Sequence, residues 1–216
     1  MKTKMQSPLA GLAALFAACM LFAVPSPACA QELGTKGNFV FNVERLFGFY
    51  VDKQSIDVGP VTNHISTTDI SLGWNAAPTA LTFPRLGLDY FIDEHFTIGG
   101  NFGLFTRSRD AGANSDDTGI LFGVRGGYAL RLSHAVSFWP RVGLSYAKVS
   151  GGAGLSADAH LVSLGLEGMF SLAPSENWSF LLGPTIDVGI DGAVGNNDMT
   201  ENCFGIMAGV LGWIGS

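Results

Sequence analysis

Large apolar side chains occupy every second position along several segments of this chain. From residue 119 to residue 132 they hold most of the even positions, while Gly, Ala and Arg hold most of the odd ones. The segments 136–149, 160–172 and 178–190 repeat this alternation. Because successive side chains of a β-strand point to opposite sides, each segment predicts a strand with one continuous apolar face.

Four further segments complete the pattern. Residues 85–92 and 96–104 alternate in the same way, and residues 39–51 alternate on odd positions with Arg45 as the exception. The last segment, 202–214, carries Gly, Cys, Met and Ala on both faces. The chain thus predicts eight strands in an up-and-down antiparallel meander.

The second face of these strands indicates what surrounds the apolar one. Gly, Ser, Ala and Thr dominate it, and charged residues make up only 14% of the chain, against about a quarter in soluble domains. Small residues with isolated charges suit a narrow polar interior, and large apolar residues suit contact with lipid. We therefore predict an all-β, antiparallel transmembrane β-barrel. The alternative, a soluble barrel, would bury the apolar face instead.

The connections between the predicted strands are of two kinds. The tight ones span residues 93–95, 133–135 and 173–177, and the longer, polar ones span residues 107–118, 150–158 and 192–200. Outer-membrane barrels have short periplasmic turns and long external loops. The order of the connections therefore predicts that the tight turns face the periplasm.

One more alternating run, residues 67–75, would make the number of strands odd, whereas single-chain bacterial barrels have even numbers. We interpret this run as an extension or cover of the first hairpin. The alternative makes it the first wall strand and leaves residues 39–51 as an N-terminal accessory.

The chain begins with the features of a secretory leader. Lys2 and Lys4 precede an apolar run over residues 9–24, and the tripeptide Ala-Cys-Ala that ends at residue 30 is a small-residue cleavage site. We predict a cleaved signal peptide over residues 1–30 and one outer-membrane β-barrel domain over residues 31–216. Cys203 is then the only cysteine, which excludes an internal disulfide. The net charge of −6 argues against nucleic-acid binding.

Eight charged residues fall on the predicted inner face. An eight-stranded barrel is just wide enough inside to be filled by its own side chains, and an unpaired buried charge costs several kcal/mol. The sequence therefore predicts a charge-paired plug with Arg125 and Glu167 near its centre; a small solute or ion channel lined by the same charges is the alternative. The predicted network comprises Glu44, Arg85, Asp89, Arg125, Arg131, Arg141, Glu167 and Asp187.

In its leader, its alternation and the order of its connections, the chain resembles the eight-stranded outer-membrane β-barrel domains of Gram-negative bacteria, the outer membrane protein A-like barrels. The segments ERLFGF (44–49) and PRLGLDYFI (84–92) are similar to those of barrel-domain proteins in that group. The resemblance covers residues 37–216 and implies a non-enzymatic structural or surface-interaction role. It implies outer-membrane lipid, lipopolysaccharide and the barrel assembly machinery as partners, and a monomer.

His64 and Ser66 are spaced so that both would lie on one strand face. Lipid A deacylases, which are also eight-stranded outer-membrane barrels, use a His/Ser pair with an acid, so a lipid A-modifying hydrolase is a further alternative. Acidic loop residues such as Asp117 and Asp198 could gather divalent cations, although solvated acids are the simpler interpretation. No glycine-rich stretch forms a phosphate loop, and we predict no cofactor or metal.

Overall fold

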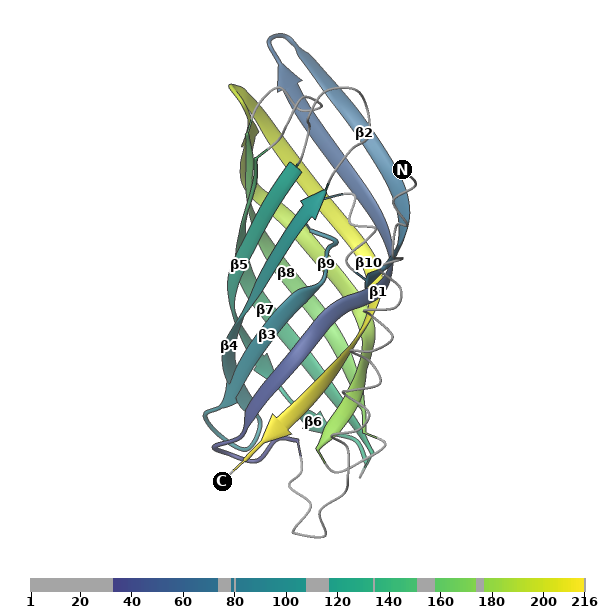
Figure 1. Cartoon of the computed structure of the whole chain (residues 1–216), viewed down its shortest axis with the longest axis vertical. Coiled ribbons are helices and arrows are strands. Elements are labelled where there is room, and N and C mark those ends of the chain that lie inside the picture. The colour runs from purple at the N-terminus through teal and green to yellow at the C-terminus, as the bar shows by residue number, and fades with distance from the viewer. Residues whose placement is uncertain are drawn as a thin grey trace, which may run out of the picture.

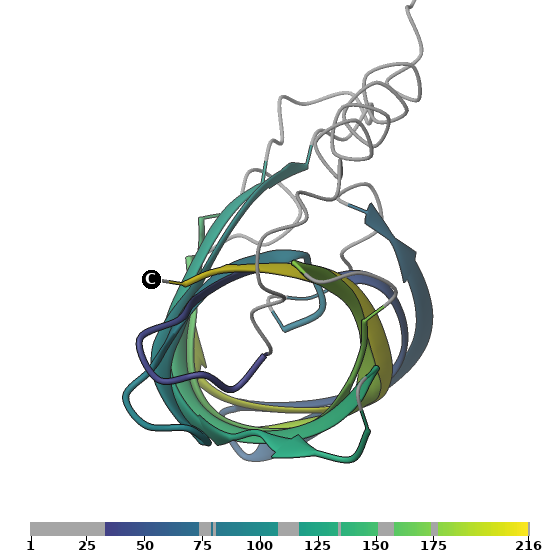
Figure 2. The same ribbon diagram turned by 90° about the horizontal axis from the view of Figure 1, so that it is seen from below.

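The computed structural model describes residues 33–73, 79, 81–107, 117–133, 135–150, 158–173 and 177–215. Within these residues, ten strands form one antiparallel sheet that closes into a barrel, because the last strand pairs with the first (Figure 1). Figure 2 shows the closed ring from below. The strands are β1 (Phe39–Val58), β2 (Val61–Leu72), β3 (Arg85–Phe91), β4 (Phe96–Arg107), β5 (Asp117–Tyr128), β6 (Leu130–Arg131), β7 (Val136–Ser150), β8 (Ala159–Leu172), β9 (Trp178–Val194) and β10 (Asn197–Ile214). No helix in the described part of the chain is long and apolar enough to span a membrane.

Eight of these strands form the barrel wall. They follow one another around the ring as β1, β3, β4, β5, β7, β8, β9 and β10, and β10 pairs with β1 to close it. The two-residue strand β6 lies beyond Ala129 and pairs with β7, so it continues the line of β5. Each wall strand is antiparallel to both of its neighbours, which confirms the predicted eight-stranded meander.

The strand β2 forms a hairpin with the upper part of β1. Residues 39–44 of β1 pair with β3, and residues 47–58 pair with β2. Because β1 also pairs with β10 along nearly its whole length, it is a wall strand, and the alternative that made residues 39–51 an accessory is wrong. Residues 67–72 lie in β2, as an extension of the first hairpin requires. The last positions of that predicted run, residues 74 and 75, lie outside the described residues.

The tight connections join the strands at one end of the barrel, the lower end in Figure 1, where β10 also finishes. The turn of the β1–β2 hairpin lies at the opposite end. This arrangement agrees with the predicted alternation of connections along the chain. Most of two predicted outer loops, residues 108–116 and 151–157, and the predicted leader, residues 1–30, lie outside the described residues.

The connection between β9 and β10 is shorter than predicted. Both strands continue to a two-residue turn at Gly195 and Asn196, where Val194 pairs with Asn197. Gly195 has a φ of 60°, a conformation that tight hairpin turns need and that glycine adopts without strain. The prediction of a loop over residues 192–200 is therefore wrong, because these polar residues lie on strands that extend past the apolar part of the wall.

Apolar side chains cover the outside of the barrel. In β3, Leu86, Leu88 and Tyr90 are exposed, and the residues between them are buried. The same holds on the other wall strands; Val124 of β5, for example, has 67% of its surface exposed. A monomeric soluble protein does not expose apolar surface on this scale. The predicted outward apolar faces are confirmed.

The interior is also apolar near its lower end, which the sequence analysis did not predict. Large side chains from the lower parts of six wall strands meet there, and the rings of Phe91 and Trp139 stack with their centroids 6.1 Å apart. Leu33, just before the first strand, packs against the same group. We call these residues the floor cluster: Val40, Phe91, Trp139, Met169, Leu181, Leu211 and Trp213.

Candidate functional site

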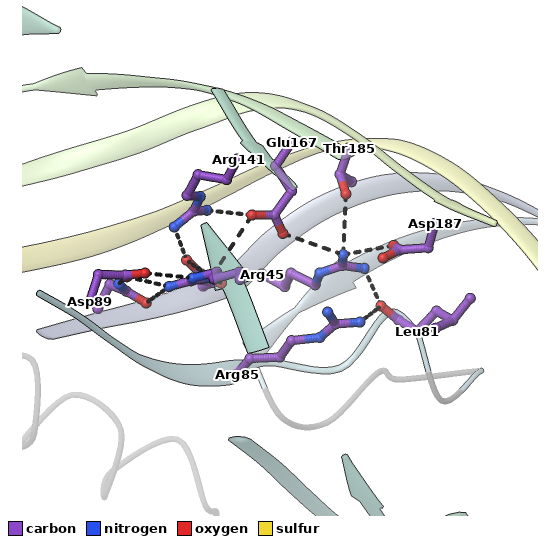
Figure 3. A network of polar contacts seen from close by, with 11 residues as sticks. Arg45, Leu81, Arg85, Asp89, Arg141, Glu167, Thr185 and Asp187 are labelled. Carbon is purple, nitrogen blue, oxygen red and sulfur yellow. Dashed lines mark hydrogen bonds and ion pairs between the residues drawn. The ribbon is translucent and has the colours of Figure 1, made fainter. Parts of the chain in front are cut away.

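A network of charged side chains crosses the barrel interior above the floor cluster (Figure 3). Its members lie on the inner faces of six wall strands, β1, β3, β5, β7, β8 and β9, so strands distant in sequence bring opposite charges together. All members are buried from solvent, with side-chain exposures of 8% or less. The charge network consists of Glu44, Arg45, Asp89, Arg125, Arg141, Glu167 and Asp187.

Arg125 of β5 binds two carboxylates from opposite sides of its guanidinium. Its Nη1 donates to both oxygens of Glu44, at 2.9 and 2.8 Å, and its Nε donates to Asp89 Oδ1 at 2.8 Å. Its Nη2 donates to the second oxygen of Asp89, which also accepts a 2.9 Å hydrogen bond from Asn42 Nδ2. Charge-assisted bidentate contacts of this kind are the strongest polar contacts in proteins. Arg125 therefore joins β1, β3 and β5 through the interior.

Arg141 of β7 extends the network across the barrel. Its Nη1 donates to Glu44 Oε1, and its Nη2 lies 2.7 Å from Glu167 Oε2, although the N–H is not directed at that oxygen. The guanidinium also lies over the indole ring of Trp139, 4.8 Å from the centroid. This cation–π contact connects the charge network to the floor cluster below it.

A bulge in β1 adds Arg45 to the network. From Val43 to Phe47, β1 advances four residues while β10 advances two, so the register shifts and the side chain of Arg45 turns inward. Arg45 has a φ of 57°, which is rare for a residue other than glycine. The sequence showed Arg45 only as an exception to the outward apolar pattern. That exception was the available signal of the bulge, because an arginine cannot lie unpaired among apolar side chains.

Arg45 reaches the far side of the interior. Its Nη2 donates to Asp187 Oδ2 at 2.7 Å and to Thr185 Oγ1 at 3.2 Å, and it lies 3.8 Å from Glu167 Oε1. Its Nη1 donates to the carbonyl oxygen of Leu81. The contacts with β9 close the ring of charge pairs, so every carboxylate of the network has an arginine partner.

Arg85 lies beside this network without an ion pair. Its Nη2 donates to the carbonyl oxygen of Leu81 at 2.9 Å, the same oxygen that accepts from Arg45. No carboxylate of the described residues lies within 4.0 Å of its guanidinium, and its Nε has no hydrogen-bond partner there. The structure thus places Arg85 inside the barrel, as predicted, but leaves its charge without a direct partner.

Arg131 is the one predicted member that lies elsewhere. It is exposed on β6, where it pairs with Ser137, two residues below the buried Ala129. The alternation of side chains predicts that Arg131 points inward. However, the enclosed interior ends at Ala129, the previous inward residue. The prediction that Arg131 belongs to the interior network is therefore wrong.

The predicted His64 and Ser66 pair does not form a catalytic arrangement. His64 Nδ1 lies 2.9 Å from Ser55 Oγ, across the β1–β2 hairpin, and Ser66 pairs with Lys53 instead. His64 and Ser66 are exposed, and among the described residues no carboxylate forms a hydrogen bond with His64. An acid that orients the imidazole is part of the arrangement that activates a serine. The described residues also contain no group of three His, Cys, Asp or Glu side chains placed to hold a metal ion.

No protein-family model matches the chain, and no curated protein matches its sequence. Several solved structures share the fold at low sequence identity, among them the following three. Neisserial surface protein A is 18% identical, with 83% of this chain and 99% of that chain covered and a TM-score of 0.52. The outer membrane protein OprG from Pseudomonas aeruginosa is 15% identical, with 86% of this chain and 100% of that chain covered and a TM-score of 0.53. The outer membrane protein AlkL, solved in lipid bilayers, is 13% identical, with 89% of this chain and 98% of that chain covered and a TM-score of 0.50. The chain therefore has the fold of the eight-stranded outer-membrane β-barrels.

Proposed function

We propose that this protein spans the outer membrane as a closed barrel and acts as a structural or surface-interaction protein. The single observation that carries the proposal is the combination of an apolar outer wall with an interior filled by paired charges. The wall suits lipid, and the filled interior leaves the β1–β2 hairpin and the outer loops as the parts that partners can reach. Outer-membrane lipid and lipopolysaccharide are the proposed surroundings.

The β1–β2 hairpin supports this orientation. On the outward face of β2, the exposed Leu72 and Ile70 continue the apolar wall, and the next outward residues, Thr68, Ser66 and His64, are polar. A strand that leaves hydrocarbon for water changes its outward side chains in this way. We infer that the hairpin leaves the lipid near Thr68 and extends beyond the cell surface.

An epitope tag inserted at the hairpin turn, between Gly59 and Pro60, tests the orientation. We expect an antibody to bind this tag on intact cells, because the turn lies on the proposed outer side. A matched tag at Ser133, in a tight turn at the opposite end, should be bound only after the outer membrane is permeabilised. Binding to the Ser133 tag alone on intact cells would reverse the proposed orientation.

Conductance measurements distinguish a plug from a pore. In planar bilayers we expect the refolded barrel to show no discrete channel openings, because the charge network and the floor cluster both cross the interior. The double variant Arg125→Ala/Trp139→Ala removes one large side chain from each layer and should increase ion leakage. Regular, ion-selective openings of the unaltered protein would instead favour the small channel.

A further inference from the structure

We infer that Asp52 and Glu201 share one proton at neutral pH and act as a pH-sensitive latch between the outer parts of β1 and β10. We call these two residues the acid pair. They lie inside the barrel, beyond the charge network and on the outer side of the proposed lipid boundary at Thr68. The pairing of β1 with β10 closes the ring, so the latch acts on the closure of the barrel. The inference goes beyond the proposed structural role, which requires no response to pH.

The register of β1 and β10 brings the two carboxyl groups together. Asp52 pairs with Cys203, and Gln54 pairs with Glu201, so Asp52 and Glu201 are diagonal neighbours on adjacent strands. Both side chains point into the interior, and each residue has only 3% of its surface exposed. Their carboxyl groups lie within hydrogen-bond distance of each other.

A contact between two buried carboxyl groups requires a proton. Ionised carboxylates only accept hydrogen bonds and repel each other, whereas a protonated carboxyl group donates to an ionised neighbour. Burial raises the pKa of Glu201, and the negative charge of Asp52 raises it further. Burial also raises the pKa of Asp52, although the hydrogen bond with Glu201 acts in the opposite direction. The acid pair therefore keeps one proton at a pH at which exposed carboxyl groups are ionised.

No positive charge in the described part of the chain takes the place of this proton. No lysine or arginine of the described residues lies within 4.0 Å of either carboxyl group. Asp52 Oδ1 and Glu201 Oε1 are also buried without a hydrogen-bond partner there. The four buried arginines of the interior are already balanced by the four carboxylates of the charge network. These eight residues are Arg45, Arg85, Arg125, Arg141, Glu44, Asp89, Glu167 and Asp187.

The groups around the acid pair favour the protonated state. Asp69 of β2 is a diagonal neighbour of Asp52, and its negative charge opposes ionisation of the pair. Asp187 of β9 also acts on both carboxyl groups, although its ion pair with Arg45 at 2.7 Å compensates most of its charge. The neutral groups beside the pair are the amide of Gln54, the hydroxyl of Thr79 and the thiol of Cys203, whose pKa is raised by burial.

Loss of the shared proton should weaken the pairing of β1 with β10. The folded acid pair holds this proton, whereas a glutamate of the unfolded chain releases it near pH ~4.3. Stability therefore falls as the pH rises above that value, by up to about tenfold in the folding equilibrium constant per pH unit. The fall ends once the folded pair is fully ionised. Glu201→Gln provides a permanent N–H donor in place of the proton, so this variant should lack the dependence.

Urea titrations of the refolded protein between about pH 5 and about pH 9 test the shared proton. Over this range we expect the unaltered barrel to lose at least about tenfold in its folding equilibrium constant relative to Glu201→Gln. Asp57→Asn is the matched control, because it removes an exposed carboxylate from the same strand and should keep the dependence of the unaltered protein. Parallel pH profiles for the unaltered protein and Glu201→Gln would overturn the inference.

Infrared spectroscopy of the unaltered protein decides the question if Glu201→Gln does not fold. We expect the carbonyl band of a protonated carboxyl group at about pH 7, where ordinary carboxyl groups are ionised, and its loss at alkaline pH. Absence of this band at neutral pH would contradict the shared proton.

Hydrogen exchange locates the effect. At about pH 9, amides of residues 52–56 and 199–203 should exchange roughly tenfold faster in the unaltered protein than in Glu201→Gln, while residues 40–43 should not differ. Equal rates at both places would contradict the latch. A barrel whose stability does not depend on pH but which still blocks ions would leave the proposed function intact.

Discussion

Replacing Arg125 with methionine is expected to destabilise the barrel by about 3–5 kcal/mol. The guanidinium makes charge-assisted hydrogen bonds to Glu44 and Asp89, which come from two other strands. Without it, both carboxylates remain buried, and Glu44 retains only Arg141 as a partner. The free energy of unfolding, measured by urea titration of the refolded barrel with tryptophan fluorescence, gives the size of the loss.

A second substitution separates lost pairing from lost packing. Adding Asp89→Asn to Arg125→Met removes the carboxylate that would otherwise stay unpaired, so the double variant should recover a large part of the stability. Arg131→Met is the matched control: it removes an exposed arginine and should cost less than about 1 kcal/mol. Equal losses for Arg125→Met and Arg131→Met would contradict the role assigned to the network.

Placing a charge on the outer wall should have the next largest effect. Val124 is 67% exposed in the middle of β5, on the face that we propose lies in hydrocarbon. Val124→Arg should therefore reduce the folding free energy in lipid vesicles by about 2–4 kcal/mol. Arg125, the next residue, shows that an arginine is accommodated on the inner face of this part of β5. A loss of stability in Val124→Arg would therefore reflect the environment of the outer face.

The control for Val124→Arg lies on the β1–β2 hairpin. Thr62 is also exposed on a strand, but near the turn and above the proposed lipid boundary. Thr62→Arg should change the folding free energy by less than about 0.5 kcal/mol. If Val124→Arg were equally harmless in vesicles, the apolar wall would not be in contact with lipid, and the soluble alternative would return.

The outward faces could be predicted from the sequence because their signal is local. In a strand that separates two environments, every second residue reports on the same side, so Leu86, Leu88 and Tyr90 identify the face of β3 without knowledge of its neighbours. Inward charges follow from the same alternation, which is why Glu44, Asp89 and Asp187 could be named in advance. Their partners could not, since the pairing depends on register and distance: Arg45 and Asp187 are 142 residues apart.

The incorrect predictions were also based on the alternation of side chains along a strand, and each has a physical cause. The bulge in β1 interrupts the alternation at Arg45 and brings this side chain inside, although odd positions such as Phe41 and Phe47 face outward on both sides of it. A rule that assigns every second residue to one face cannot anticipate such an interruption. The alternation also contains no information on where the interior ends, so Arg131 was assigned to it. The polar segment at the end of β9 suggested a loop, because strands that continue into water lose the apolar positions that identify them.

The division of β1 between two partners determines how the hairpin can change in evolution. The pairing with β3 ends at Glu44 and that with β2 begins at Phe47, while β10 holds β1 along both parts. Homologues could therefore gain or lose residue pairs of the β1–β2 hairpin near Gly59 without opening the barrel. Insertions of an even number of residues in each arm would keep the outward side chains of the hairpin on its outward face. A single-residue insertion in one arm would instead exchange the two faces of that arm between the insertion and the turn. Length variation at this tip should accordingly occur in matched, even steps.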